Sequence, residues 1–359
     1  MELTGTTTSA HRREGCAMKS PEARGCVSRA LLELLPQEPN PEGLNALSGA
    51  VTDALDASPG ILADDDLQLT LFCLYELHYG GIDGSHPDWE WEPGLIGIRR
   101  LIERDFEGAL RSAVELPSLE PRDSDGVAAV LFELAAADTG PSVSRYVAKK
   151  ASLEQAQEFL IHKSVYQLKE ADPHTWAIPR LTGRAKAAMV EIQADEYGGG
   201  RPERMHSALF ARTMRGAGLE DSYGYYLDAV PALTLASTNM MSLFGLNRRL
   251  RGAIVGHLAA YEMTSSQPNR LYGNGFRRLG FDEDVTWYFD EHVEADAVHE
   301  QIAGRDLAGG LVEAEPDLLG DVYFGAAAAL TLDCMLGEHI MGAWEKGESS
   351  LRTKVQAPA

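Results

Sequence analysis

The sequence lacks the features of several common protein classes. Its 359 residues include 32 Lys and Arg against 54 Asp and Glu, so the formal net charge is −22, and no basic cluster interrupts this excess. Nucleic acids and anionic membrane surfaces both attract basic faces, so we expect neither as a partner. No apolar run approaches the roughly 20 residues that cross a bilayer, and the N-terminus has no apolar core of a secretory signal.

Paired cysteines and strand patterns are also missing. The four cysteines, Cys16, Cys26, Cys73 and Cys334, are scattered and form no CxxC motif. This excludes a disulfide framework and fits a reducing compartment, so we expect a cytoplasmic location. Alternating runs of β-branched and aromatic residues are absent, whereas Ala, Leu, Glu and Arg recur at helical spacing. The sequence therefore predicts an all-α fold.

The length suggests about two domains. We expect a disordered leader over 1–20, an N-terminal helical domain over 21–141 and a second helical domain over 142–350, divided near Gly140–Pro141. Helical spacing and stop signals predict helices over 28–35, 41–57, 63–79, 94–115, 126–138, 152–171, 181–197, 203–217, 232–264, 282–304 and 317–345. The N-terminal domain holds no cluster of metal-binding residue types, so the chemistry is expected in the second domain.

The most informative segment is DEHVEADAVHEQ. His292, Asp296 and His299 lie at i, i+4 and i+7, within an arc of roughly 60° on one helix face. The two histidines are separated by a rise of roughly 10.5 Å, too far to share one ion without strain. Two metal ions about 3.5–4 Å apart would span that distance better. The alternative is a solvated helix face, because other acidic residues surround the three.

A dinuclear site needs further carboxylates from other helices of a bundle. The candidates are single ionisable residues beside apolar or broken helices: Glu262 after AIVGHLAAY, Glu170 before Asp172–Pro173, and Glu196 before a triple glycine that His206 follows. Each also fits a surface or helix-end position. Carboxylates with neutral imidazoles suit iron or manganese, and the absence of paired thiolates disfavours structural zinc.

The partner of His206 is ambiguous from the sequence. A straight helix would place Glu196 and His206 roughly 15 Å apart, but Gly198–Gly200 and Pro202 break it and let the chain turn back. This predicts a mobile metal-binding segment. Glu203 is the rival, because Glu203 and His206 form the ExxH spacing of ferritin-like di-iron bundles. Spacing alone leaves both open.

Two stretches, KEADPHTWAIPRLTGRAKAAMVEIQADEYGGGRPERMHSALF and WYFDEHVEADAVHEQIA, resemble the haem-oxygenase-like di-iron oxidases and oxygenases. The resemblance implies a haem-oxygenase-like bundle over 142–350 and favours Glu196 over Glu203. It implies seven ligands in two sets, with the ion served by His299 left open. One iron would be held mainly by Glu170, Glu196 and His206, and the other by Glu262, His292, Asp296 and His299.

The same resemblance implies an activity. The two iron ions would use O₂ to oxidise the nitrogen of an amine, guanidine or 2-aminoimidazole to a hydroxylamine or nitro product in natural-product biosynthesis. An external electron donor or reductase is implied, since the sequence has no nicotinamide or flavin fingerprint. Alternatives are a desaturase or C–C lyase of the same fold, and a metal-storage protein. The resemblance also implies a homodimer formed through 21–141, with a cover over the active-site mouth as the rival role.

Overall fold

A computed structural model of the chain describes residues 17–120, 123–137, 140–353 and 355, with the backbone alone over 294–297. Within these ranges the chain is helical, with one isolated β-bridge between Met18 and Ile82 and no strand. The predicted all-α fold is confirmed.

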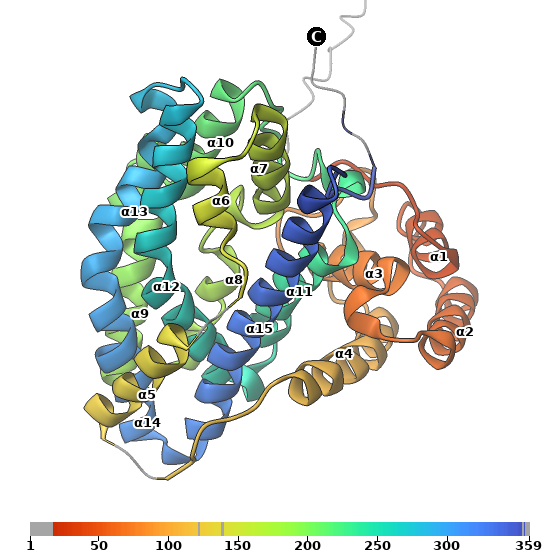
Figure 1. Cartoon of the computed structure of the whole chain (residues 1–359). Helices are drawn as coiled ribbons and strands as arrows, with labels where there is room; N and C mark the ends of the chain where they lie inside the picture. Colours follow the sequence, from red (N-terminus) through yellow and green to blue (C-terminus); the bar gives the residue numbers. More distant parts are fainter. Residues whose placement is uncertain (1–16, 121–122, 138–139, 354, 356–359) are drawn as a thin grey trace, which may run out of the picture.

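The helices form a smaller and a larger group (Figure 1). The smaller group consists of α1 (Cys26–Leu34), α2 (Pro41–Ala57), α3 (Asp65–Glu76) and α4 (Pro93–Ala113). The principal helices of the larger group are α5 (Ser124–Ala136), α6 (Val143–Lys149), α7 (Leu153–Gln167), α9 (Gly183–Glu196), α10 (His206–Gly216), α11 (Ala232–Leu246), α12 (Arg251–Arg278), α13 (Glu283–Gln301) and α15 (Leu319–Glu345). Short helices α8 (Asp172–Thr175) and α14 (Gly310–Ala314) complete it.

Several helix starts follow from local capping. The Asn40 side chain accepts a hydrogen bond from the Gly43 amide at the start of α2. Ser152 and Gln155 form a reciprocal capping box at the start of α7. Asp282 caps α13, as the sequence predicted. Such caps satisfy backbone amides that have no partner within the helix, so these boundaries are set by adjacent residues.

Packing divides the chain at a different place from the predicted boundary near residue 141. Helix α5 packs against α12 and against the π-helical segment Ile302–Gly309, both in the larger group. The approach is close, since a Cβ on Gly309 would lie 2.7 Å from Ser124 Cα. Helix α5 therefore belongs with the bundle rather than with the smaller group in which the sequence analysis placed it.

The predicted leader is described only from residue 17 onwards. Met18 is buried, and its backbone exchanges hydrogen bonds with Gly81 and Asp83 of the smaller group. This end of the predicted leader therefore packs against folded residues. The prediction of disorder over 1–16 lies outside the described residues.

The single helix predicted over 232–264 is wrong, because the chain forms α11 and α12 with a break between them. The Arg180 guanidinium donates to the carbonyls of Gly245 and Leu246, which satisfies the last turn of α11 and ends it. Helix α12 then continues beyond the predicted end at residue 264, through Pro268 to Arg278. The Asn247 side chain also donates to the Leu243 carbonyl, so a local residue and the distant Arg180 together fix the break.

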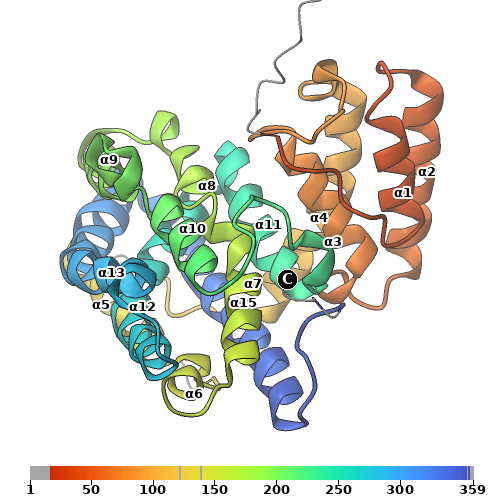
Figure 2. The same ribbon diagram turned by 90° about the horizontal axis from the view of Figure 1, so that it is seen from above.

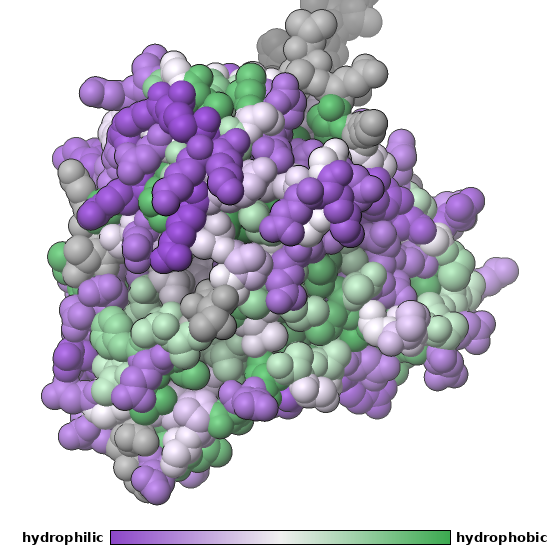
Figure 3. All heavy atoms as spheres, in the orientation of Figure 1, coloured by the Kyte–Doolittle hydropathy of each residue, from purple (hydrophilic) through white to green (hydrophobic). Residues whose placement is uncertain are grey.

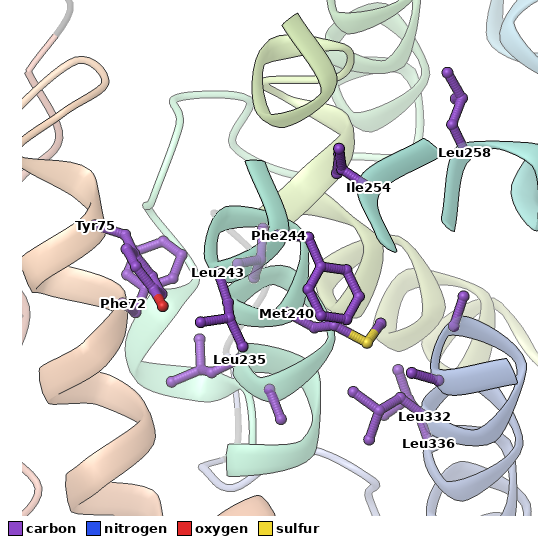
Figure 4. Close-up of a cluster of buried hydrophobic side chains, with 14 of the residues drawn as sticks. Phe72, Tyr75, Leu235, Met240, Leu243, Phe244, Ile254, Leu258, Leu332 and Leu336 are labelled. Atoms are coloured by element: carbon purple, nitrogen blue, oxygen red, sulfur yellow. The ribbon is translucent and has the colours of Figure 1, made fainter. Parts of the chain in front are cut away.

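Helix α11 lies between α3 and α15 and joins the two groups (Figures 2 and 4). Figure 4 shows its buried side chains reaching both neighbours. Helices α12 and α15 approach more closely still: a Cβ on Gly256 would lie 1.8 Å from Val322 O, and one on Gly325 would lie 1.9 Å from Ala253 O. Glycine is required at both positions, because any side chain would push the helices apart.

One helical stretch in the described part of the chain, Pro316–Glu345, is long and apolar enough to cross a membrane by length and composition. Within the protein, 61% of its most apolar window is buried, and it packs along α12. Burial in the core accounts for its apolar character.

Figure 3 shows a largely hydrophilic upper half on one face of the molecule, with hydrophobic residues gathered in the lower half.

Candidate metal centre

Six of the seven predicted ligands meet inside the bundle. They form two groups, in each of which one ligand atom per residue lies within 4.8 Å of the others, and all six side chains are buried. The first group is Glu170, His206 and His292, and the second is Glu196, Glu262 and His299. The seventh predicted ligand, Asp296, belongs to α13, but its side chain lies outside the described residues.

A strained turn presents Glu170. It lies just beyond the end of α7 and is followed by Ala171, whose φ of +77° is the one positive value among the described non-glycine residues. Such a conformation costs an alanine about 1–2 kcal/mol. The Ala171 carbonyl accepts a hydrogen bond of 2.8 Å from Gln193 of α9, which holds the turn in place. The strain is compensated by contacts around a functional side chain.

The triple glycine turns the chain back between Glu196 and His206. Gly198, Gly199 and Gly200 have φ values of +69°, +59° and +79°, which L-residues rarely adopt. His206 begins α10, and its Nδ1 lies 3.0 Å from Glu196 Oε2. Glu203 is exposed. The structure therefore brings Glu196 to His206, whereas Glu203 points to the surface.

His292 is oriented by its own helix. Its Nδ1 lies 2.8 Å from the Tyr288 carbonyl, which can only accept, so Nδ1 carries the proton and Nε2 keeps a lone pair. That Nε2 lies 3.5 Å from Glu170 Oε1. The Tyr288 hydroxyl donates to both Glu170 oxygens at 3.1 and 3.0 Å. Tyr288 thus fixes two ligands, and the sequence analysis did not identify it.

His299 is held from both sides. Its Nε2 lies 2.9 Å from Asp195 Oδ2, and its Nδ1 lies 3.5 Å from Glu262 Oε2. Because Asp195 contacts Nε2, Nδ1 is the His299 nitrogen that faces the other members of the second group. No sequence pattern marks Asp195, although it immediately precedes the predicted ligand Glu196.

The two groups differ from the sets that the resemblance implies. His292 joins Glu170 and His206, while Glu196 joins Glu262 and His299. The two histidines of α13 thus fall in separate groups, as their rise along the helix indicates. Glu196 is near both groups, because one of its oxygens is also close to His206. It lies where a bridging carboxylate would be placed.

The electrostatics of the site reflect three buried carboxylates. Burial favours the neutral acid, but the His206 imidazole outweighs it and holds the pKa of Glu196 below its usual value. For Glu262 burial dominates, and its pKa is raised. Burial opposes protonation of His299, but the adjacent negative carboxylate of Glu262 outweighs it and raises the pKa of His299 to about 9. The site therefore attracts positive charge, either protons or metal cations.

The donor set fits non-haem iron or manganese. His206 Nδ1 and His299 Nδ1 are buried without a hydrogen-bond partner, and each faces a carboxylate oxygen. Buried nitrogens of this kind are unfavourable unless something binds them. Three carboxylates with three imidazoles, and no thiolate, form a ligand set for non-haem iron or manganese.

A cavity of about 570 Å³ adjoins both groups. Carboxylates of the two groups form part of its wall, together with His292 and Tyr288. One face of α7 lines it at helical spacing, with Phe159, His162, Lys163, Tyr166, Gln167 and, beyond the helix end, Glu170. The cavity is within the roughly 300–1,000 Å³ range of pockets that hold small ligands.

Comparisons with known proteins agree with this site. Residues 157–333 match the family model described as iron-containing redox enzyme, a haem-oxygenase-like family. This range includes every candidate ligand. A nitrosourea synthase from Streptomyces achromogenes subsp. streptozoticus is 29% identical over 226 residues, which are 61% of this chain and 47% of that protein. The chain thus spans about half the length of this curated relative.

A solved structure is also similar. The crystal structure of a CADD-like protein of unknown function from Nostoc punctiforme has 15% sequence identity and a TM-score of 0.48, and covers 65% of this chain and 99% of that one. The residues that match the family model, 157–333, make up just under half of the chain. Through these residues the chain is similar to a haem-oxygenase-like family of iron-containing redox enzymes.

Proposed function

We propose that the protein is a non-haem di-iron N-oxygenase, which uses O₂ to oxidise the nitrogen of an amine, guanidine or 2-aminoimidazole in natural-product biosynthesis. The observation that carries this proposal is the pair of buried three-ligand groups beside a cavity large enough for a substrate. The relative named nitrosourea synthase supports oxidation at nitrogen.

The overall reaction needs reducing equivalents. Formation of a hydroxylamine balances as R–NH₂ + O₂ + 2 e⁻ + 2 H⁺ → R–NHOH + H₂O. Bound iron supplies the activation of O₂. The electrons come from an external donor or reductase, and the homodimer and cytoplasmic location expected from the sequence are part of the same proposal. A nitro product requires further rounds of the same oxidation.

The residues of this chain bind the metals and exclude water. Glu170, Glu196 and Glu262 would supply the negative charge that holds two cations, and Glu196 lies near both ligand groups. His206, His292 and His299 supply the nitrogen ligands. Tyr288 and Asp195 hold ligand side chains in orientation, which prevents the loss of affinity that freely rotating ligands would cause. Burial of all six ligands limits access of bulk water.

The test begins with anaerobic loading of Fe(II) and measurement of iron per chain. Exposure to ¹⁸O₂ with L-arginine, L-lysine or 2-aminoimidazole and a chemical reductant should place labelled oxygen on nitrogen, as detected by mass spectrometry. Oxidation or cleavage at carbon without labelled nitrogen would instead indicate a desaturase or C–C lyase. Iron far above two equivalents per chain, held as mineral, would indicate storage.

A further inference from the structure

A second pair of charged residues lines the cavity beyond the metal ligands. Lys163 of α7 and Asp333 of α15 both line it, with 3.6 Å between Lys163 Nζ and Asp333 Oδ1. Their side chains are 31% and 58% accessible, so both remain open to solvent or to a ligand. Asp333 raises the pKa of Lys163 despite the opposing effect of burial, so the ammonium stays charged.

Another lysine, six residues further along the chain, provides a contrast. Lys169 Nζ lies 2.8 Å from Glu76 Oε2, and their side chains are only 6% and 1% accessible. That pair is sealed and structural. The pair of Lys163 and Asp333 is longer and open, and ion pairs of this kind contribute little to stability. Lys163 and Asp333 can therefore give up their contact with each other and bind charged groups of a ligand with little loss of folding stability.

The distance from this pair to the metal ligands suits an extended ligand. Lys163 lies within α7 and Glu170 beyond its C-terminal end at Gln167, and both line the cavity; the four helical residues after Lys163 alone account for roughly 6 Å of their separation. The remaining wall includes aromatic rings that can pack against methylene groups: Tyr166, Tyr261, Tyr272 and Phe289. The cavity thus has a charged end, an aromatic middle and a metal-binding end.

We propose that Lys163 and Asp333 bind the α-carboxylate and α-ammonium groups of an amino acid whose side-chain nitrogen lies at the metal ligands. This inference rests on the proposed function and narrows its substrate class. An amino acid with a terminal guanidine or amine matches both charges and the length of the cavity. A small heterocycle such as 2-aminoimidazole has no zwitterionic end for the pair, and it would leave most of the 570 Å³ unfilled.

The test measures binding by calorimetry on the Fe(II)-loaded protein without oxygen, so that no turnover occurs. The ligands are L-arginine, L-lysine, their decarboxylated counterparts agmatine and cadaverine, and 2-aminoimidazole. At least one amino acid should bind about tenfold more tightly than its decarboxylated counterpart, since a charge-assisted contact is lost. Lys163→Gln should remove this preference. The substitution should lower the affinity for the amino acid about tenfold and leave the affinity for its decarboxylated counterpart unchanged.

A second variant tests the other charge. Asp333→Asn should lower the affinity for L-arginine. It should leave the affinity for 5-guanidinopentanoate unchanged, because that compound lacks the α-ammonium group. Glu338→Gln is the matched control, because Glu338 is exposed on the same helix and does not line the cavity; it should change none of the affinities. If one variant fails to fold, the other variant and the wild-type ligand comparison still decide the question.

Equal affinity for amino acids and their decarboxylated counterparts would overturn the proposal, as would tighter binding of 2-aminoimidazole or no binding of either amino acid. These outcomes are separate from failure of the proposed function. That failure would appear as missing iron or as the absence of labelled nitrogen after exposure to ¹⁸O₂, whatever the binding data show.

Discussion

Lys169 Nζ lies 2.8 Å from Glu76 Oε2, and this buried ion pair connects α3 of the smaller helical group to the residue that precedes the candidate metal ligand Glu170. The Tyr223 hydroxyl donates to the same Glu76 oxygen at 2.8 Å. The lysine ammonium also lies over the ring of Tyr79, 4.2 Å from its centroid. The N-terminal helices therefore help to hold the turn that carries Glu170.

Glu76→Gln should destabilise the protein and weaken iron binding. It leaves the Lys169 ammonium buried without a carboxylate, a change that costs about 3–5 kcal/mol in buried pairs. Urea denaturation measures the stability, and titration with Fe(II) measures the metal affinity. Asp306→Asn is the control, because its ion pair with Arg184 is half-exposed and should contribute about 0–1 kcal/mol. Equal effects of the two substitutions would contradict the structural role of Glu76.

Glu196→Ala should reduce bound iron below two equivalents per chain, because Glu196 lies near both ligand groups. Glu203→Ala should leave the iron content unchanged, because Glu203 is exposed. Iron is quantified after anaerobic loading and removal of unbound metal. Loss of iron from the Glu203 variant alone would show that the ExxH pair is the metal-binding one.

Gly198→Ala should impair iron binding more than Gly199→Ala does. Both positions have positive φ, so alanine costs each roughly 1–2 kcal/mol. A Cβ on Gly198 would in addition lie 2.6 Å from the backbone of Arg204 and Met205, whereas one on Gly199 meets nothing within 4 Å. The overlap displaces the turn that leads to His206. Fe(II) titrations of the two variants, with folding checked by circular dichroism, distinguish the effect of displacing the turn from the effect of backbone strain, which both variants share.

Tyr288→Phe should lower iron affinity by about 10–100-fold, the usual cost of losing a group that orients a metal ligand. The substitution removes the hydroxyl that donates to both Glu170 oxygens and keeps the ring that packs beside Phe210. Competition with a chelator measures the affinity, and thermal unfolding should change little. An unchanged affinity would show that Glu170 keeps its orientation without Tyr288.

Acid should destabilise the protein partly through His162. Burial lowers the pKa of His162 to about 3 in the folded state, against an ordinary value of 6.5. The unfolded chain therefore binds a proton that the folded protein does not, and stability falls as pH drops from about 6.5 to about 3, at up to about 1.4 kcal/mol per pH unit. The groups around it are Thr234, Ser350, His339 and Lys163.

His162→Gln removes this titration. The variant should lose less stability than the wild type between pH 6.5 and pH 4.5 in urea denaturation, even if it is less stable at pH 7. Carboxylates titrate in both proteins. The difference between the two slopes of stability against pH therefore gives the contribution of His162. Parallel slopes would show that His162 does not contribute.

Much of the local structure could be predicted because its causes are close in sequence. Asp282 caps α13, and the helical repeat places His292 and His299 on one side of that helix. The triple glycine indicates a reversal before α10, since positive φ values favour glycine. Seven other predicted helices also coincide with observed ones to within three residues at each end, because apolar spacing and stop residues act within one turn.

Other features depend on residues that are distant in sequence. Helix α11 ends where Arg180 reaches its last carbonyls, and Arg180 lies outside the predicted segment 232–264. The same holds for α5, whose apolar face predicts burial but does not identify its neighbours.

The amino-acid sequence by itself determined that the chain is helical and which residue types could bind a metal, because hydrogen bonding, capping and helical period are short-range. Only the tertiary structure decided that His292 meets Glu170 and His206, while His299 meets Glu196 and Glu262. Those groupings depend on distances between helices, which close contacts such as that of Gly256 with Val322 set. Packing of whole helices, rather than any local preference, brings the six ligands together.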